Sequence, residues 1–325
     1  MLKILRPKKK MDNETLGTRD NHTRLFIVLL VALILLLLAS FIFDLKIDRR
    51  DISAPSGTAL KTFPEVRLEA RAAYVYDMRN QEVIFAKNEN TRLSLASLTK
   101  VMAALVASEL TLPESTIKIS NEALALDGDS GLYRDERWRL RDLLDFSLIT
   151  SSNDGMRAVA LALGAISRSD ATEDQIINDF VREMNAKANE LGLKNTYFWN
   201  ETGLDESDVK GGAYGTAKDI ALLIEHILSE RPELLKATKE PERVFESLDK
   251  IVHTATNTNS ITERIPGLIA SKTGATDTAG GNLVIVFDPE LGRPIIISVL
   301  GSTTEGRFND IETLIQATLE YITDK

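Results

Sequence analysis

An uncharged apolar segment near the start of the chain constrains its fold most. Residues 25–43 read LFIVLLVALILLLLASFIF, nineteen residues without a charged side chain. As a helix rising about 1.5 Å per residue, the segment is about 29 Å long, enough to cross the hydrocarbon core of a bilayer. A helix inside a globular domain is rarely apolar on every face. The sequence therefore predicts a single transmembrane anchor at residues 25–43.

The charges around this segment predict its orientation. Residues 1–24 hold seven Lys and Arg against three acidic residues, a net charge of +4, so the rest of the chain carries −13 within an overall −9. Basic flanks stay on the cytoplasmic side of a membrane. We expect residues 1–24 to form a cytoplasmic tail and residues 44–325 to be extracytoplasmic. The acidic balance of the exported part does not suit nucleic acid, which needs positive charge.

The end of the apolar segment bears on whether the anchor is retained. A cleaved signal peptide is the alternative, but it has a shorter apolar region followed by small residues. Ala39 and Ser40 are instead followed by the bulky sequence FIF, so an uncleaved anchor is favoured. Residues 44–65 are mixed and polar and are typical of a linker. Residues 66–325 are then predicted to be one domain, long enough to bury its own core.

Hydrophobic periodicity places strands at both ends of this domain and helices between them. Strand patterns cover residues 72–77, 82–86, 268–272, 282–287 and 294–300. Helix patterns cover residues 94–110, much of 138–230, with a capping box at Thr172 and Gln175, and 307–321. Since the two strand regions must meet, we predict an α/β (α+β) fold. Its antiparallel sheet combines N- and C-terminal segments, is flanked by helices and carries an inserted helical region.

Composition excludes several kinds of chemistry. The chain has no cysteine, which rules out thiolate catalysis and cysteine zinc sites. It has only three histidines, so no metal site and no cofactor is predicted. His253 has no acidic partner visible in the sequence, and no nucleophile-elbow motif accompanies any histidine. A Ser-His-Asp triad is therefore not expected.

A Ser-x-x-Lys motif at Ser97 and Lys100 is the first candidate for catalysis. The pattern alone is weak, because residues 115–118 and 247–250 also match it. Only Ser97 begins a strongly apolar helix, which would place Lys100 one turn away on the same face. A serine hydroxyl needs a base to become a nucleophile, and a lysine in a dry pocket can lose its proton and act as that base. The alternative is an ordinary helix start with a surface lysine.

Two further motifs follow in the chain. Residues 151–153 (SSN) lie between two predicted helices, where they could equally form a capping loop. Residues 272–274 (KTG) end an apolar strand. There a lysine and a threonine suit a carboxylate, and a glycine allows close approach of a ligand. A strand running into a turn is the alternative for this motif.

Together, the three motifs resemble those of penicillin-binding proteins and serine β-lactamases, in the same order and on the same element types. The closest likeness is to the D-alanyl-D-alanine carboxypeptidases of the low-molecular-mass penicillin-binding group, and it covers about residues 70–322. Further matching segments are residues 96–99 (ASLT), 184–192 (MNAKANELG), 195–198 (NTYF), 203–205 (GLD), 216–219 (TAKD), 272–281 (KTGATDTAGG) and 307–308 (RF). The resemblance implies a β-lactamase/transpeptidase-like fold. Many members carry Ser-Gly-Asn in place of Ser-Ser-Asn, and many continue into a C-terminal β-rich domain and anchor.

The resemblance implies four catalytic residues. Ser97 would attack the carbonyl between two D-alanines and become acylated. Lys100 would take its proton and later help water to attack the ester. Ser151 would relay a proton to the leaving amine, and Asn153 would hold the substrate amide and Lys100. Lys100, on its apolar helix, is expected to be more enclosed than the second lysine of the site.

It also implies five substrate-binding positions. Lys272 and Thr273 would bind the terminal carboxylate, and Gly274 would let the substrate approach. The backbone N–H of Ala275 would form the oxyanion hole with that of the nucleophile. Arg307 would add positive potential.

The implied partners are peptidoglycan stem peptides ending in D-Ala-D-Ala, with β-lactam antibiotics as covalent inhibitors. A D,D-endopeptidase that cleaves cross-links uses the same residues and stays open as an alternative. A serine β-lactamase is less favoured, because Glu230 and Glu233 lack the sequence context of its deacylating glutamate. A non-catalytic wall-binding protein would be expected to have lost some of these reactive groups.

Overall fold

The computed structural model describes residues 30–31, 62–165 and 171–323. Residues Met1–Lys61 and Thr62–Lys325 form two units, and the second holds the strands and helices between Ala72 and Thr323. The predicted tail, and all but two residues of the predicted anchor, lie outside the described residues, as does most of the predicted linker. Within the described part, no helix has the length and hydropathy needed to cross a bilayer.

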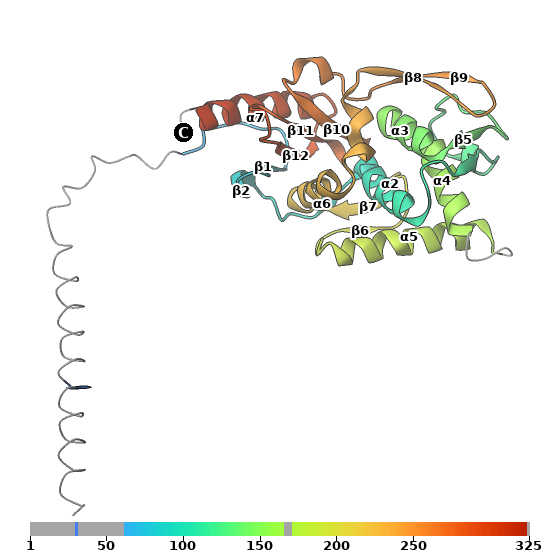
Figure 1. Ribbon diagram of the computed structural model, residues 1–325, viewed down its shortest axis with the longest axis horizontal. Coiled ribbons are helices and arrows are strands. Elements are labelled where there is room, and N and C mark those ends of the chain that lie inside the picture. The colour runs from blue at the N-terminus through green and yellow to red at the C-terminus, as the bar shows by residue number, and fades with distance from the viewer. Residues whose placement is uncertain (1–29, 32–61, 166–170, 324–325) are drawn as a thin grey trace, which may run out of the picture. The chain divides into compact units, whose positions relative to one another are not determined.

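A five-stranded antiparallel sheet organises the second unit (Figure 1). Its strands, in spatial order, are β10 (Leu268–Thr276), β11 (Gly280–Phe287), β12 (Ile295–Ser302), β1 (Ala72–Asp77) and β2 (Glu82–Lys87). Strand β1 pairs with β12 from Ala72 opposite Leu300 to Asp77 opposite Ile295. The N- and C-terminal segments therefore meet at the centre of one sheet, which confirms the predicted fold class.

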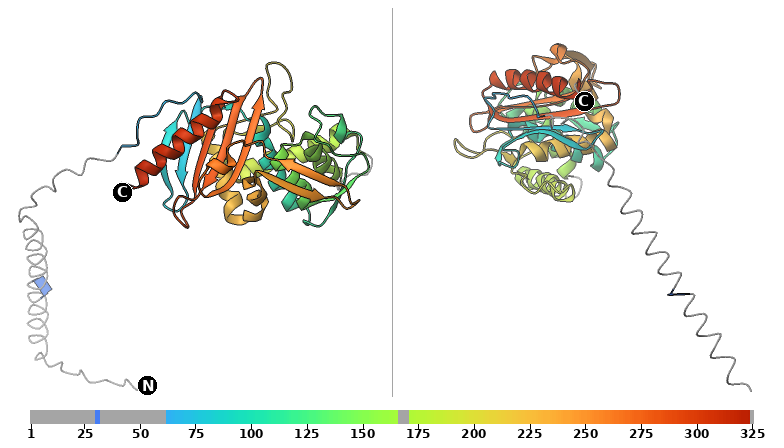
Figure 2. Two further views of the ribbon diagram at one scale, coloured as in Figure 1. Left: turned by 90° about the horizontal axis from the view of Figure 1, so that it is seen from above. Right: turned by 90° about the vertical axis from the view of Figure 1, so that its left-hand side faces the viewer.

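Helices cover both faces of this sheet, and the alternation of the strands shows how. In β11, Leu283, Ile285 and Phe287 pack in one cluster with α7 (Gly306–Thr323). Val284 and Val286 point the other way, into a larger cluster that includes α2 (Thr99–Leu110) and α6 (Ala217–Glu230). Figure 2 shows α7 lying across one face of the strands. Burial on both faces explains why these strands are almost continuously apolar.

The inserted region between β2 and β10 is mainly helical. It contains α3 (Leu140–Thr150), α4 (Asn153–Gly164) and α5 (Glu173–Glu190). The predicted capping box of α5 is confirmed, since Thr172 accepts from the backbone N–H of Gln175 and the Gln175 side chain accepts from that of Thr172.

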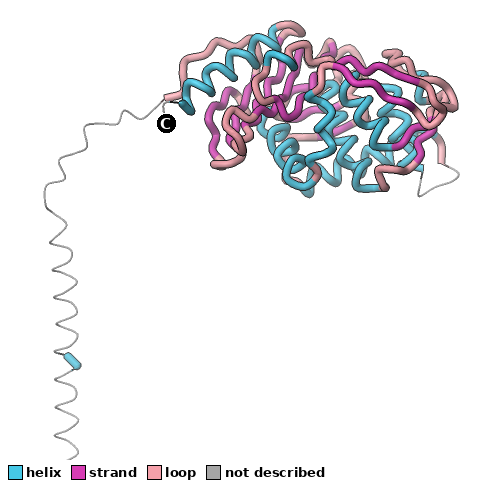
Figure 3. Tube along the Cα trace, turned by 45° about the horizontal axis from the view of Figure 1, so that its top comes forward, coloured by secondary structure: helices cyan, strands magenta, loops and turns pink. Residues whose placement is uncertain are grey.

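Seven short strands also lie in the described part of the same region. They are β3 (Leu93–Ser94), β4 (Thr116–Lys118), β5 (Arg137–Arg139), β6 (Tyr197–Phe198), β7 (Ala213–Gly215), β8 (Glu242–Glu246) and β9 (Val252–Thr256). The hairpin β8–β9 lies along the helical region against α3 (Figure 3).

Candidate active site

Ser97 lies in a tight turn and not inside a long helix, which corrects the prediction for residues 94–110. The chain passes from β3 through a 3₁₀ turn (Ala96–Leu98) into α2. Ala96 has φ +48°, a left-handed conformation that costs energy for a residue with a side chain. Its carbonyl rests on Gly203, where a Cβ would lie 1.9 Å from that oxygen. The turn leaves Ser97 partly exposed while its neighbours are buried.

Lys100 follows one turn later and is fully buried. Its Nζ lies 2.9 Å from Ser97 Oγ, 2.7 Å from Asn153 Oδ1 and 2.8 Å from the Thr202 carbonyl oxygen. Burial lowers the pKa of Lys100 to about 7, against the opposing effect of the Glu201 carboxylate. The geometry suits a neutral amine, which would donate to the two acceptors and accept a proton from Ser97.

The loop between α3 and α4 brings Ser151 and Asn153 to the same place. Ser151 ends α3 with φ +61°, and its Oγ accepts from Lys272 Nζ at 2.9 Å. Asn153 begins α4, and its Nδ2 donates to the Asp127 carbonyl at 2.7 Å. Ser152 is buried and caps α4 by accepting from the Gly155 N–H at 2.9 Å. Its hydroxyl therefore stabilises the helix that carries Asn153.

The Lys-Thr-Gly motif lies within β10, which continues to Thr276 and does not end at the motif as the sequence suggested. Lys272 is buried and donates to Ser151 and to the carbonyl of Thr273 at 2.7 Å. The Thr273 hydroxyl is 2.6 Å from that of Thr258. A Cβ on Gly274 would lie 2.9 Å from the Leu95 carbonyl and 3.1 Å from the Ser97 nitrogen. Glycine thus lets β10 approach the turn that holds Ser97.

Three cationic side chains meet beside this strand. Arg307 is buried and its Nη1 donates to the Gly274 carbonyl at 2.9 Å, so it braces β10 from α7. Burial, then the charges of Lys100 and Arg307, hold the pKa of Lys272 well below its ordinary value. Lys100 and Lys272 are 0% and 2% exposed, so the expected difference in enclosure is absent. Their contacts distinguish them: one reaches Ser97 and the other Ser151.

An open polar cleft of about 680 Å³ adjoins these residues. Ala275, at the exposed face of β10, and Thr202 both border it. Its other lining residues are Ala125, Leu126, Asp127, Arg157, Asn200, Leu204, Asp205, Glu206, Thr276 and Asp277. A second depression, of about 530 Å³, lies between α3 and the end of α6, and unlike the polar cleft, which Ala275 borders, it is lined by none of the predicted site residues. The polar cleft is therefore the candidate substrate site.

The sequence missed several residues that complete the site. Thr202 acts through its backbone carbonyl, which has no sequence signature. Thr258 lies in a polar loop far from Thr273 in sequence. Asp205 belongs to a segment noted for its resemblance, and it accepts from the Thr276 and Thr278 hydroxyls at 2.9 and 2.7 Å, which fastens the end of β10.

His253 does have an acidic partner in space, contrary to its appearance in the sequence. Its Nε2 lies 2.7 Å from Glu136 Oε1, and both side chains are buried. The ring packs 5.0 Å from that of Trp138 and 5.9 Å from that of Phe146. The pair belongs to an aromatic cluster around β5 and α3.

Comparison with known proteins identifies the family. The sequence profile of the D-alanyl-D-alanine carboxypeptidases matches residues 59–304. The chain belongs to this family. It is 34% identical over 236 residues to the D-alanyl-D-alanine carboxypeptidase DacF of Bacillus subtilis, covering 70% of this chain and 57% of that protein. It is 29% identical to the D-alanyl-D-alanine carboxypeptidase DacB2 of Mycobacterium tuberculosis, over 73% of this chain and 77% of that protein.

Solved structures of the family have the same fold. Penicillin-binding protein D2 of Listeria monocytogenes, in its ampicillin-bound form, superposes with a TM-score of 0.65 and 29% identity. The match covers 79% of this chain and 99% of that one. The predicted resemblance to the carboxypeptidase family is thus confirmed. The roles assigned to single residues remain predictions.

Proposed function

We propose that this family member is a penicillin-binding serine D,D-carboxypeptidase that removes the terminal D-alanine from peptidoglycan stem peptides. The observation that carries the proposal is the buried Lys100, whose Nζ is 2.9 Å from the partly exposed Ser97 hydroxyl and whose pKa is lowered to about 7. A lysine in this state is a general base matched to neutral pH.

In the proposed acylation, one proton passes from Ser97 to Lys100 and one reaches the leaving amine. Ser97 Oγ bonds to the carbonyl carbon of the penultimate D-alanine while its proton passes to Lys100. The bond from that carbon to the nitrogen of the terminal D-alanine then breaks. That nitrogen takes the proton held by Lys100, relayed through Ser151, which leaves Lys100 neutral again. The backbone N–H groups of Ser97 and Ala275 would stabilise the oxyanion, at about 3 kcal/mol per donor. Water then attacks the ester with Lys100 as base, which releases the shortened peptide.

The terminal carboxylate of the substrate would bind beside Lys272 and Thr273, where the positive charge of Arg307 also favours it. In the free protein, burial and then the charges of Lys100 and Arg307 hold the pKa of Lys272 well below its ordinary value, so the charged form of Lys272 is disfavoured. An arriving carboxylate raises that pKa and favours the charged form. Lys272 would then be the cation and Lys100 the neutral amine, so substrate binding would prepare the base for its task.

Digestion of defined muropeptides tests the proposed activity. We expect monomeric pentapeptides to lose one D-alanine, seen by mass spectrometry as a tetrapeptide product. Cross-linked dimers should stay joined. Cleavage of the cross-link at a comparable rate would instead favour a D,D-endopeptidase. If neither product forms and the intact pentapeptide is recovered, the carboxypeptidase proposal is refuted.

Binding of β-lactams is part of the same proposal. The Listeria relative has been crystallised with ampicillin and with cefotaxime. The cations around Lys272 suit the carboxylate of these drugs, and Ser97 would open the lactam ring. Slow hydrolysis of the resulting ester would distinguish this protein from a β-lactamase.

We further propose that the protein is anchored in the cell membrane by residues 25–43, with its catalytic domain outside. This rests on the uncharged segment and its basic flank. Protease added to spheroplasts should digest the domain and leave a protected N-terminal fragment, identified by mass spectrometry. A mature protein that begins after residue 39 would show instead that the segment is a cleaved signal peptide.

A further inference from the structure

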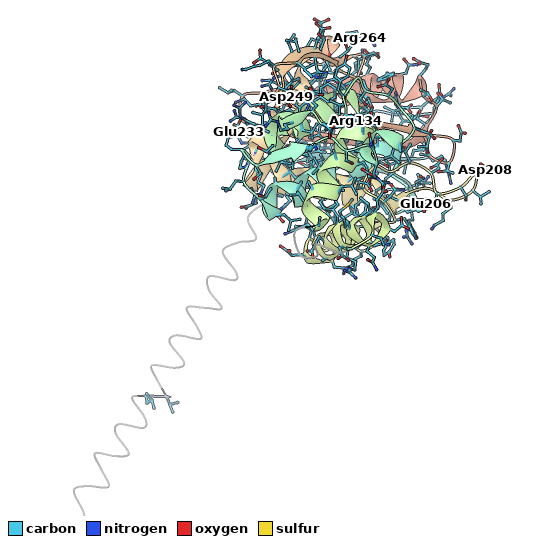
Figure 4. All side chains as sticks on the ribbon, turned by 90° about the vertical axis from the view of Figure 1, so that its right-hand side faces the viewer. Arg134, Glu206, Asp208, Glu233, Asp249 and Arg264 are labelled. Carbon is cyan, nitrogen blue, oxygen red and sulfur yellow. The ribbon has the colours of Figure 1, made fainter. Side chains whose placement is uncertain are left out.

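A buried ion pair between Arg157 and Glu201 lies near Lys100, the proposed base, and has no role in the mechanism proposed above. Arg157 Nε lies 2.7 Å from Glu201 Oε1, with the carboxylate side chain 0% exposed and the arginine 15% exposed. Other pairs lie on the surface, such as Arg137 with Asp249, and Figure 4 labels Asp249 there. Desolvating a carboxylate is costly, and a buried ion pair is weak support for stability by itself. The position of this pair suggests that it has a role other than stabilising the fold.

The pair joins the two segments that hold Lys100. Arg157 lies on α4, one turn after Asn153, which accepts from Lys100 at 2.7 Å. Glu201 directly precedes Thr202, whose carbonyl accepts from Lys100 at 2.8 Å. The next residue, Gly203, supports the carbonyl of Ala96 beside the nucleophile. An ion pair between Arg157 and Glu201 therefore fixes the distance between two of the three partners of Lys100.

Glu201 is placed to act through Lys100 and not on the substrate. The polar cleft is lined by Arg157 and Thr202 but not by Glu201, which has no exposed surface. It therefore has no access to a water in the cleft.

Several other charged groups lie around the site. The charges of Lys100 and of Arg307 on α7 both lower the pKa of Lys272 on β10. On α4, Arg157 faces Glu201, and Asp154 accepts from the Ser130 N–H. Among these groups, the Glu201 carboxylate is the one that favours the charged form of Lys100.

Resting on the proposed function, we propose that the Arg157–Glu201 ion pair is a positioning unit for the lysine base, holding Asn153 and Thr202 around Lys100 and balancing the charge that surrounds it. Glu201 opposes the lowering of the Lys100 pKa that burial causes. Burial in turn raises the pKa of Glu201, and Arg157 opposes that shift. The pair thus combines a geometric role with an electrostatic one.

The test is the pH dependence of Ser97 acylation by a fluorescent penicillin, measured with the full chain. Glu201→Gln removes the anion, which lowers the pKa of Lys100 and makes it neutral at lower pH. We expect the acidic limb of the rate profile to move down by about one pH unit. In the double variant Arg157→Gln/Glu201→Gln both charges are gone, and the limb should return to near its original position.

The conservative change Arg157→Lys separates position from charge. It keeps the cation but alters the geometry, so the limb should stay in place while the plateau rate falls about tenfold. This variant also leaves no buried charge without a partner, so it tests the inference if Glu201→Gln does not fold.

Asp77→Asn is the matched control. Asp77 is also fully buried and pairs with Arg293 Nε at 2.9 Å, at the end of β1 remote from the motifs. Its loss should lower the melting temperature without moving the limb. An unmoved limb in Glu201→Gln, together with an unchanged plateau in Arg157→Lys, would overturn the inference. Absence of labelling in the unaltered protein would overturn the proposed function itself and the inference with it.

Discussion

Ser97→Ala is expected to abolish covalent labelling by penicillin and the release of D-alanine. The hydroxyl oxygen is the atom that would bond to the substrate carbonyl, and it lies 2.9 Å from the proposed base Lys100. The protein should stay folded, because Ser97 is partly exposed and its side chain caps no helix. Its loss should therefore cost less than loss of a helix cap, which costs at most about 2 kcal/mol. The measurement is mass spectrometry of the labelled protein, with a thermal melt to establish folding.

Ser115→Ala provides the matched control, because residues 115–118 have the same Ser-x-x-Lys spacing. The structure places Thr116–Lys118 on a short strand, with Lys118 exposed and paired to Asp135. Labelling should persist in this variant. A label that maps to Ser115, or that survives in Ser97→Ala, would contradict the assignment of the nucleophile.

Lys100→Arg is expected to lower the acylation rate about 10³-fold at neutral pH. Arginine keeps its proton at any working pH, so it cannot accept one from Ser97. Wild-type acylation should rise with pH through about 7, where Lys100 loses its proton. The variant should show no such rise. Stopped-flow labelling between about pH 5 and pH 9 makes the comparison.

Lys272→Gln is the informative comparison, because it removes the other buried ammonium group. We expect weaker capture of substrates with a free terminal carboxylate and little change for the same substrates with that group amidated. Loss of the neighbouring cation also raises the pKa of Lys100, so the acidic limb should move to higher pH. Equal loss on both substrates would argue against Lys272 as the carboxylate site. A fully active Lys100→Arg would argue against a lysine base.

The long elements could be predicted because their burial repeats along the chain. Strands β11 and β12 are apolar at nearly every position, since α7 covers one face and α2 with α6 the other. The two-residue strands β3 and β6 carry no such repeat, and their pairing with β7 depends on neighbours distant in sequence. The strand β3 and the 3₁₀ turn before α2 likewise break a helical pattern, because Gly203 and Gly274 pack against that turn.

In the candidate site, too, some groups could be predicted from the sequence and others could not. The sequence indicated side chains whose chemistry is local, such as a serine one turn before a lysine. It gave no sign of the Thr202 carbonyl, because every residue has one and only the fold aims it. Arg307 was expected to supply positive potential alone, whereas it also donates to the Gly274 carbonyl from α7. Glu201 had no motif to mark it.

The sequence by itself determined the family, the fold class and the set of reactive groups, because these depend on residue types, their spacing and the period of burial. Only the tertiary structure decided which groups meet. It brought three separate segments together, which carry Ser97 with Lys100, Asn153, and Lys272, and it excluded water from both lysines. The lowered pKa of Lys100 follows from that exclusion. Desolvation depends on every neighbour packed around a group, and so it has no signature in the residues beside it along the chain.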